Sequence, residues 1–285
     1  MSTLSIIRTT SVAVSILATV LGVAACDRVT APPPLPSDAE QFSPPAIYST
    51  WWEMTRACSG LSGSLASVTW YQTNQAQYDR RTGEQVIGNW TSPGDRIVMA
   101  ASAMLEGGAV RHEMLHALLQ KVGHSRGYFL GKCAGTVDCE RACILDAGPY
   151  PKPAQTPIHV TASDMVISVA VDPPNPDAQN GGFFIITVSA HNPSNSWATV
   201  APIFAGTDTT ATFSYDVRGQ NGDVHEGELA LDPSERIFAP GETKKLVFDF
   251  RIGDAPFGRQ IQQGSYNARG GYSDFWSGDV PFVVQ

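Results

Sequence analysis

Two histidines and a glutamate with the spacing of a metal site are the residues of this 285-residue chain best suited to chemistry. They lie in His112-Glu113-Met114-Leu115-His116, where the two histidines are four residues apart. In a helix such residues project from the same face, so both imidazoles can bind one zinc ion. Glu113 could then accept the proton of a metal-bound water that attacks a carbonyl carbon. The motif predicts a hydrolytic zinc site with Glu113 as its general base.

The residues around the motif predict the helix that this chemistry needs. Residues 106–122 are expected to form it, because leucine and valine recur at helical spacing along one face. These apolar positions are Leu115, Leu118, Leu119 and Val122. Gly123 stands where such a helix would end. Before it, residues 48–57 are expected to form a short helix, and residues 67–72 and 95–100, rich in β-branched and aromatic side chains, are expected to form strands.

A catalytic zinc site needs a third protein ligand, and the sequence offers more than one. His124 is favoured, because Gly123 before it could turn the chain back and bring the imidazole to the metal. The alternative is a carboxylate further along the chain, first Glu140 and then Asp138 or Asp146 near it. Zinc is the expected cofactor in either arrangement.

Residues 110–119 resemble the active-site helix of the zincin metallopeptidases. The resemblance implies a minimal α+β zincin-like domain over residues 46–148 that cleaves a peptide or protein substrate. The metzincin branch of the zincins has a glycine three residues and a histidine six residues beyond the second metal histidine. This chain has Leu119 and Val122 at those positions, so it does not follow the metzincin pattern. The gluzincin branch takes a glutamate from a later helix, which is the place of Glu140.

Two further roles follow from the zincin resemblance alone. In larger zincins the strand before the metal helix binds extended substrate along its edge, which implies that role for residues 95–100. Tyrosines stabilise the oxyanion in several zincin families, and Tyr128 is the nearest candidate here. The alternative for Tyr128 is simple packing with Phe129.

The N-terminus has the features of an export signal. Residues 1–25 combine Arg8 with an apolar run that is shorter than the roughly 20 residues of a spanning helix. The run ends at Val23-Ala24-Ala25-Cys26, which resembles a bacterial lipobox and implies lipidation of Cys26. We therefore expect a lipoprotein of the bacterial cell envelope, anchored in a membrane on the periplasmic or cell-surface side. Residues 26–45 are rich in proline and are expected to form an extended tether.

The remaining four cysteines suggest two disulfides, since disulfides are usual in exported proteins. Three pairings are possible, and we favour Cys58 with Cys133 and Cys139 with Cys143. The first pair would tie the start of a domain to the segment after its main helix. The alternative is a structural zinc site formed by the cysteines between residues 133 and 143.

The C-terminal part is predicted to be an all-β domain. A linker at residues 149–157, stiffened by prolines, separates it from the metal-site region. Residues 158–285 contain short β-rich runs between turn formers, which favours an antiparallel sandwich. The clearest strands are expected at residues 165–171, 183–190, 211–217, 245–252 and 280–284.

Three short motifs in this part resemble immunoglobulin-like β-sandwich modules such as the intracellular proteinase inhibitor domain. They are Phe238-Ala239-Pro240-Gly241-Glu242-Thr243, Phe248-Asp249-Phe250 and Gly264-Ser265-Tyr266. The resemblance implies a fold and no activity.

Two functions remain open from the sequence. The first is a lipid-anchored zinc peptidase with an accessory β-sandwich. The second is a catalytically inactive zincin-like envelope lipoprotein that binds a partner or acts as a scaffold through its β-sandwich. Glu113 favours the enzyme, because a platform would not need an acid–base carboxylate. Nucleic-acid binding is not expected, since the net charge is -8 and no basic cluster appears along the chain.

Overall fold

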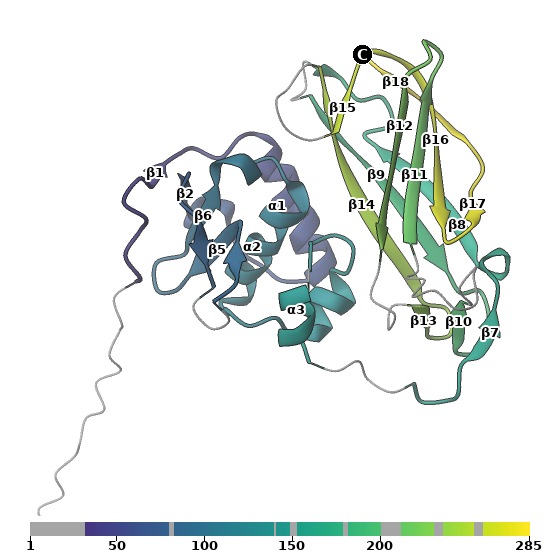
Figure 1. Ribbon diagram of the computed structural model, residues 1–285, viewed down its shortest axis with the longest axis horizontal. Helices are drawn as coiled ribbons and strands as arrows, with labels where there is room; N and C mark the ends of the chain where they lie inside the picture. The colour runs from purple at the N-terminus through teal and green to yellow at the C-terminus, as the bar shows by residue number, and fades with distance from the viewer. Residues whose placement is uncertain are drawn as a thin grey trace, which may run out of the picture. The chain divides into compact units, whose positions relative to one another are not determined.

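β-Strands dominate the fold (Figure 1), with 41% strand against 22% helix, so the protein is β-rich as expected. The computed structural model describes residues 32–79, 83–139, 141–148, 153–178, 182–200, 212–230, 236–253 and 259–285. Residues 32–285 form one compact unit. The predicted signal segment 1–25 and Cys26 lie outside the described residues, and the predicted boundary at 149–157 stays a prediction.

The N-terminal part contains a four-stranded sheet in the order β1-β2-β6-β5. Its strands are β1 (Glu40–Gln41), β2 (Thr69–Thr73), β5 (Gly88–Thr91) and β6 (Arg96–Ala100). The two inner strands, β2 and β6, are parallel, and each outer strand is antiparallel to its neighbour. A separate small hairpin joins β3 (Gln77–Tyr78) to β4 (Gln85–Val86). The strands expected at residues 67–72 and 95–100 are therefore present, as β2 and β6.

The predicted tether over residues 26–45 is too long at its C-terminal end. Residues 40 and 41 pair with Gln72 and Tyr71 as strand β1. Just before them, the Asp38 carboxylate accepts hydrogen bonds from the Thr73 hydroxyl and the Asn74 backbone. The composition of this segment does not reveal the attachment, because most of it is made by main-chain pairing and by polar side chains such as those of Asp38 and Ser37.

Two helices pack with this sheet around one apolar core. They are α1 (Ile47–Ser59) and α2 (Gly107–Leu119), and the core includes the buried side chains of Trp51, Trp70 and Met114. Short helical turns connect the elements: η1 (Leu65–Ser67), η2 (Ala101–Ala103), the π-helical turn η3 (Tyr128–Lys132), α3 (Arg141–Asp146) and η4 (Ala162–Asp164).

The predicted end of the long helix is wrong by three residues. α2 ends at Leu119, and Gln120 adopts a left-handed conformation with φ 54°, where its N–H bonds to the His116 carbonyl. Gly123 is not among the residues with positive φ. Val122 lies beyond the helix and is 55% exposed, so it does not extend the apolar face. A glycine is the usual residue at this position, which is why Gln120 was not recognised.

The C-terminal part consists of three sheets. Their orders are β15-β14-β9-β8, then β12-β11-β16-β17 with β18 also on β16, then β13-β10-β7. The strands are β7 (Ile158–Val160), β8 (Val166–Asp172), β9 (Phe183–His191), β10 (Ala198–Val200), β11 (Thr212–Gly219), β12 (Val224–Ala230), β13 (Ile237–Phe238), β14 (Thr243–Ile252), β15 (Arg259–Ile261), β16 (Gly264–Tyr272), β17 (Phe275–Trp276) and β18 (Val280–Val284).

The two larger sheets share one apolar core. β16 packs against β8 and β9 of the other sheet, and buried side chains such as Ile186, Phe250 and Tyr266 belong to one cluster. Most neighbouring strands are antiparallel, as expected, but β14 with β15 and β7 with β10 are parallel pairs. All five predicted strands are present.

Both disulfides have the pairing favoured from the sequence. Cys58 of α1 is bonded to Cys133, and Cys139 is bonded to Cys143 of α3. All four thiols are thereby used, so the alternative of a cysteine-ligated zinc site is wrong. Within the described residues, no helix has the length and apolar character needed to cross a membrane.

A buried ion pair joins α2 to the C-terminal sheets. Arg111 is 1% exposed, and its guanidinium donates two hydrogen bonds, of 2.8 and 3.0 Å, to the Asp249 carboxylate on β14. Its Nε donates to the Thr136 carbonyl at 2.5 Å, and Trp51 of α1 donates to the same Asp249 carboxylate at 3.1 Å. The residue directly before His112 is therefore tied to β14.

Replacing Asp249 by asparagine should destabilise the protein strongly. Breaking a buried pair leaves an uncompensated charge, which costs about 3–5 kcal/mol in typical cases. The measurement is urea unfolding of the variant beside Glu53→Gln, which breaks the exposed Arg56–Glu53 pair on α1 and should change little. Equal small losses in the two variants would show that the Arg111–Asp249 pair does not hold the two regions together.

Candidate metal centre

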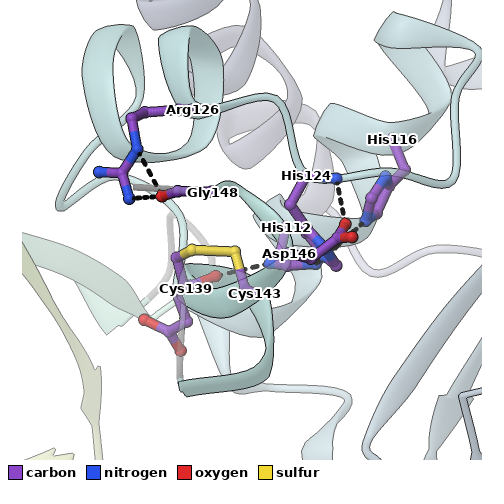
Figure 2. The surroundings of a disulfide bond; sticks show 9 residues. His112, His116, His124, Arg126, Cys139, Cys143, Asp146 and Gly148 are labelled. Carbon is purple, nitrogen blue, oxygen red and sulfur yellow. Dashed lines mark hydrogen bonds and ion pairs between the residues drawn. A yellow bond between two sulfur atoms is a disulfide. The ribbon is translucent and has the colours of Figure 1, made fainter. Parts of the chain in front are cut away.

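The turn after α2 determines whether a third histidine can reach the pair on the helix. α2 presents His112 and His116 one turn apart, as the motif predicts. The left-handed Gln120 then reverses the chain, so that His124 points back toward the pair. His112, His116 and His124 form a group that could hold a metal ion. Figure 2 shows the three imidazoles converging.

The distances among the three imidazoles fit a tetrahedral metal. The Nε2 atoms of His112 and His124 are 3.0 Å apart, those of His112 and His116 3.1 Å, and those of His116 and His124 3.3 Å. Zinc–nitrogen bonds of about 2.0–2.1 Å at tetrahedral angles would separate such nitrogens by about 3.3–3.4 Å. Small rotations would therefore suffice, and a fourth position would remain for water or substrate.

Each imidazole is held by a hydrogen bond at its other nitrogen. The Nδ1 atom of His112 is 2.6 Å from the Asp138 carbonyl oxygen, and that of His116 is 2.7 Å from the Lys121 carbonyl oxygen. Because a carbonyl can only accept, both Nδ1 atoms must carry the proton. The Nδ1 atom of His124 is 2.9 Å from the Asp146 carboxylate. The Nε2 atoms of His112 and His116 are then lone-pair donors, as metal ligands must be, and the Nε2 atom of His124 points to the same place.

Burial keeps two of these histidines neutral. It lowers the pKa of His112 to about 4, with the nearby His124 acting in the same direction. Burial also lowers the pKa of His116, again helped by the neighbouring imidazoles. Neutral imidazole is the form that binds metals, so the site favours the ligand state at neutral pH.

Aromatic rings form the walls of the site. The ring centroid of Phe129 lies 4.9, 4.8 and 4.9 Å from those of His112, His116 and His124. Trp90 of β5 stacks on His116 at 6.4 Å with an interplanar angle of 11°. Both aromatic side chains are buried. They restrict the imidazole orientations and keep the inner side of the site apolar.

Glu113 occupies a buried position between α2 and strand β5. It is 6% exposed, and burial raises its pKa to about 8, opposed by a hydrogen bond from the Trp90 backbone. Gly88 of β5 leaves room for the Glu113 side chain, since a Cβ at residue 88 would lie 2.8 Å from the Glu113 Cγ. A carboxyl group with such a pKa can both take and return a proton near neutral pH.

The other residues weighed from the sequence have different places. Asp138 and Asp146 bond to His112 and His124 and are not themselves among the three grouped residues. Glu140 lies outside the described residues. Tyr128 packs in the cluster around Leu115 with the Lys132 ammonium 4.9 Å from its ring centre, and it is its neighbour Phe129 that contacts the histidines.

Strand β6 cannot present a free edge as the resemblance implied for residues 95–100. It pairs with β2 on one side and with β5 on the other. Within the described sheet β5 is one of the two terminal strands, and it contacts α2. The short Gly88–Thr91 segment has no strong strand pattern, so it was not predicted.

Comparisons with known proteins do not assign the chain to a family, since no family model and no curated protein matches it. Among solved structures, an alkylpurine DNA glycosylase, AlkC, from Pseudomonas fluorescens is 11% identical with a TM-score of 0.29, over 43% of this chain and 30% of that one. A β-glucosidase from Listeria innocua is 12% identical with a TM-score of 0.24, over 42% of this chain and 16% of that one. This chain thus spans less than a third of either protein, and likenesses at these scores carry no argument.

The raised pKa of Glu113 predicts how the stability of the metal-free protein depends on pH. The ordinary pKa is 4.5 and the folded value about 8, so its stabilising contribution is complete below 4.5 and is lost as pH rises through 8. Glu113→Gln does not titrate, and should therefore gain stability relative to wild type between about pH 5 and 9, by a few kcal/mol at most.

Urea unfolding of chelator-treated protein at several pH values measures this difference. The lowered pKa values of His112 and His116 act in the opposite direction, but they are present in both proteins and cancel in the comparison. A difference that stays constant with pH would show that Glu113 is not held in a buried, protonated state.

The third ligand can be identified by two substitutions. His124→Ala should lower zinc affinity by orders of magnitude, because it removes one of three converging nitrogens. Glu140→Ala should leave the affinity nearly unchanged. Competition with a chromophoric chelator measures both, and the reverse result would make Glu140 the ligand and the site gluzincin-like.

Proposed function

We propose that this protein is a zinc-dependent peptidase whose metal is held by His112, His116 and His124. The observation that carries the proposal is the convergence of three Nε2 atoms within 3.0–3.3 Å of one another, next to the buried carboxyl group of Glu113. In this proposal residues 46–148 form a minimal zincin-like domain, and residues 158–285 form an immunoglobulin-like sandwich. The proposal also keeps Cys26 as a lipid anchor in the bacterial envelope.

Bound zinc would supply a Lewis acid and a water of lowered pKa at the open fourth position. The protein's own contribution is to move protons. Glu113 accepts one proton at its carboxylate when the water attacks, and donates it to the amine that leaves. The hydrogen bond from the Trp90 backbone favours the charged carboxylate, while burial favours the protonated form. The two opposing influences suit a group that must alternate between both states.

The position of strand β5 supports a peptide as the substrate. The strand is one of the two terminal strands of the described sheet, it contacts α2, and its residue Trp90 stacks on His116. An extended peptide that adds to a sheet edge at this place would have its backbone next to the metal. We therefore assign to β5 the substrate-binding role that the resemblance implied for residues 95–100.

Glu113→Gln should separate catalysis from metal binding. The amide keeps the size and helix propensity of the side chain but cannot accept a proton, so peptide cleavage should fall by about 100- to 10,000-fold. Zinc content should persist, whereas His112→Ala should lose both the metal and the activity. Cleavage of casein and of a quenched fluorescent peptide library, with zinc content determined on the same samples, measures these effects.

A matched control is Glu106→Gln, at the exposed N-cap of the same helix, which should behave as wild type. If the wild-type protein binds zinc but cleaves neither probe, the scaffold function is favoured. Unchanged cleavage by Glu113→Gln would remove the motif from the catalytic site.

A further inference from the structure

One short segment supplies hydrogen-bond acceptors to two of the three grouped histidines (Figure 2). The Asp138 carbonyl accepts from His112. The Asp146 carboxylate accepts from His124 and lies beside it in Figure 2. The same Asp146 oxygen also accepts from the His124 backbone N–H at 2.8 Å. His124 is thus held to Asp146 by both its side chain and its main chain.

The disulfide between Cys139 and Cys143 lies between these two acceptors. Cys139 directly follows Asp138, and Cys143 lies in α3, which ends at Asp146. Cys143 is buried in a cluster with Leu115 of α2 and with Phe129, the ring that contacts all three imidazoles. The cross-link is therefore packed against the side of α2 that carries the metal motif.

Helix α3 depends on the disulfide and on neighbouring hydrogen bonds for its stability. It has six residues, and helices of this length are not stable by themselves. The disulfide closes the chain at its first turn, and just beyond its end the Gly148 carbonyl accepts a hydrogen bond of 3.0 Å from Arg126. The segment is fixed at both ends, so the position of the Asp146 carboxylate is fixed as well.

The three histidines differ in how much they need this support. His112 and His116 are placed by α2, whose backbone holds them whatever lies beyond it. His124 comes from the connection after the helix, where neighbouring contacts must hold it. A carboxylate that accepts from Nδ1 fixes the ring and its tautomer and raises its basicity, and loss of such a partner typically costs 10- to 100-fold in metal affinity.

We propose that Asp146 is a positioning residue for the third metal ligand, and that the Cys139–Cys143 disulfide holds Asp138 and helix α3 as the outer layer of the metal centre. This inference rests on the proposed metal site. It gives the disulfide a role in metal affinity that is separate from any general stabilisation of the fold. The Cys58–Cys133 bond, which ties α1 to the turn after η3, is not part of this layer.

The test measures zinc affinity by chelator competition in full-length mature protein. Asp146→Asn should bind zinc about 10-fold more weakly than wild type and Asp146→Ala up to about 100-fold, because the amide still accepts a hydrogen bond and alanine cannot. The double variant Cys139→Ser, Cys143→Ser should fall in the same range. Asp274→Asn, an exposed carboxylate far along the chain, is the matched control and should not change the affinity.

Two further readouts separate positioning from general stability. Combining Asp146→Ala with the cysteine substitutions should cost less than the product of the separate losses, because both act on the same interaction with His124. The visible absorption of the cobalt(II)-loaded protein should change in Asp146→Ala, since these bands report the ligand set. Independent, multiplicative losses with unchanged cobalt bands would overturn the proposal.

The result also distinguishes this inference from the proposed function. If wild type binds zinc through the three histidines and the Asp146 and cysteine variants bind it equally well, the outer layer is disproved and the metal site stands. If wild type itself binds no zinc, the metal site is disproved and the outer layer with it.

Discussion

The burial of one positive charge determines how this protein is put together around its candidate site. The Arg111 guanidinium is 1% exposed, and a charge in such a place must be paired and hydrogen-bonded. Its partners are the Asp249 carboxylate of β14 and the Thr136 carbonyl, and the Trp51 ring lies 5.8 Å away. Because Arg111 directly precedes His112, the contacts that satisfy the charge also fix the start of the metal motif.

A dependence on partners outside the helix extends to every imidazole. Each Nδ1 atom bonds to an acceptor outside α2, in the segments of Lys121, Asp138 and Asp146. Phe129, from yet another turn, contacts all three rings. The helix contributes the spacing of two of the candidate ligands, and the surrounding segments contribute the orientation of all three. This explains how so short a region can bring three histidines together.

How much the sequence could predict follows from this division. Local periodicity was sufficient for α2, for His112 and His116, and for strands such as β9, whose side chains alternate between half-buried and buried. Features that arise from tertiary contact were missed. Gln120 adopts the left-handed turn that Gly123 was expected to make, and β16, a central strand, contains Gly270 because a Cβ there would meet Val188 at 2.7 Å. In a sequence, a glycine of this kind suggests a turn. Here the close packing of the two sheets requires a glycine within a strand.

The protonation states of the buried groups give a physical reason why the site suits a divalent cation. Without a metal, burial keeps His112 neutral by lowering its pKa to about 4 and keeps Glu113 protonated at neutral pH by raising its pKa to about 8. His112 and Glu113 then carry no charge beside the apolar wall of Phe129 and Trp90, which suits such surroundings. A cation held by three neutral imidazoles would add positive charge beside Glu113 and favour release of its proton, since a nearby opposite charge lowers the pKa of a carboxyl group. Metal binding would thereby convert the buried acid into the base that the proposed hydrolysis requires, so the burial of Glu113 and the neutrality of His112 and His116 belong to one electrostatic arrangement.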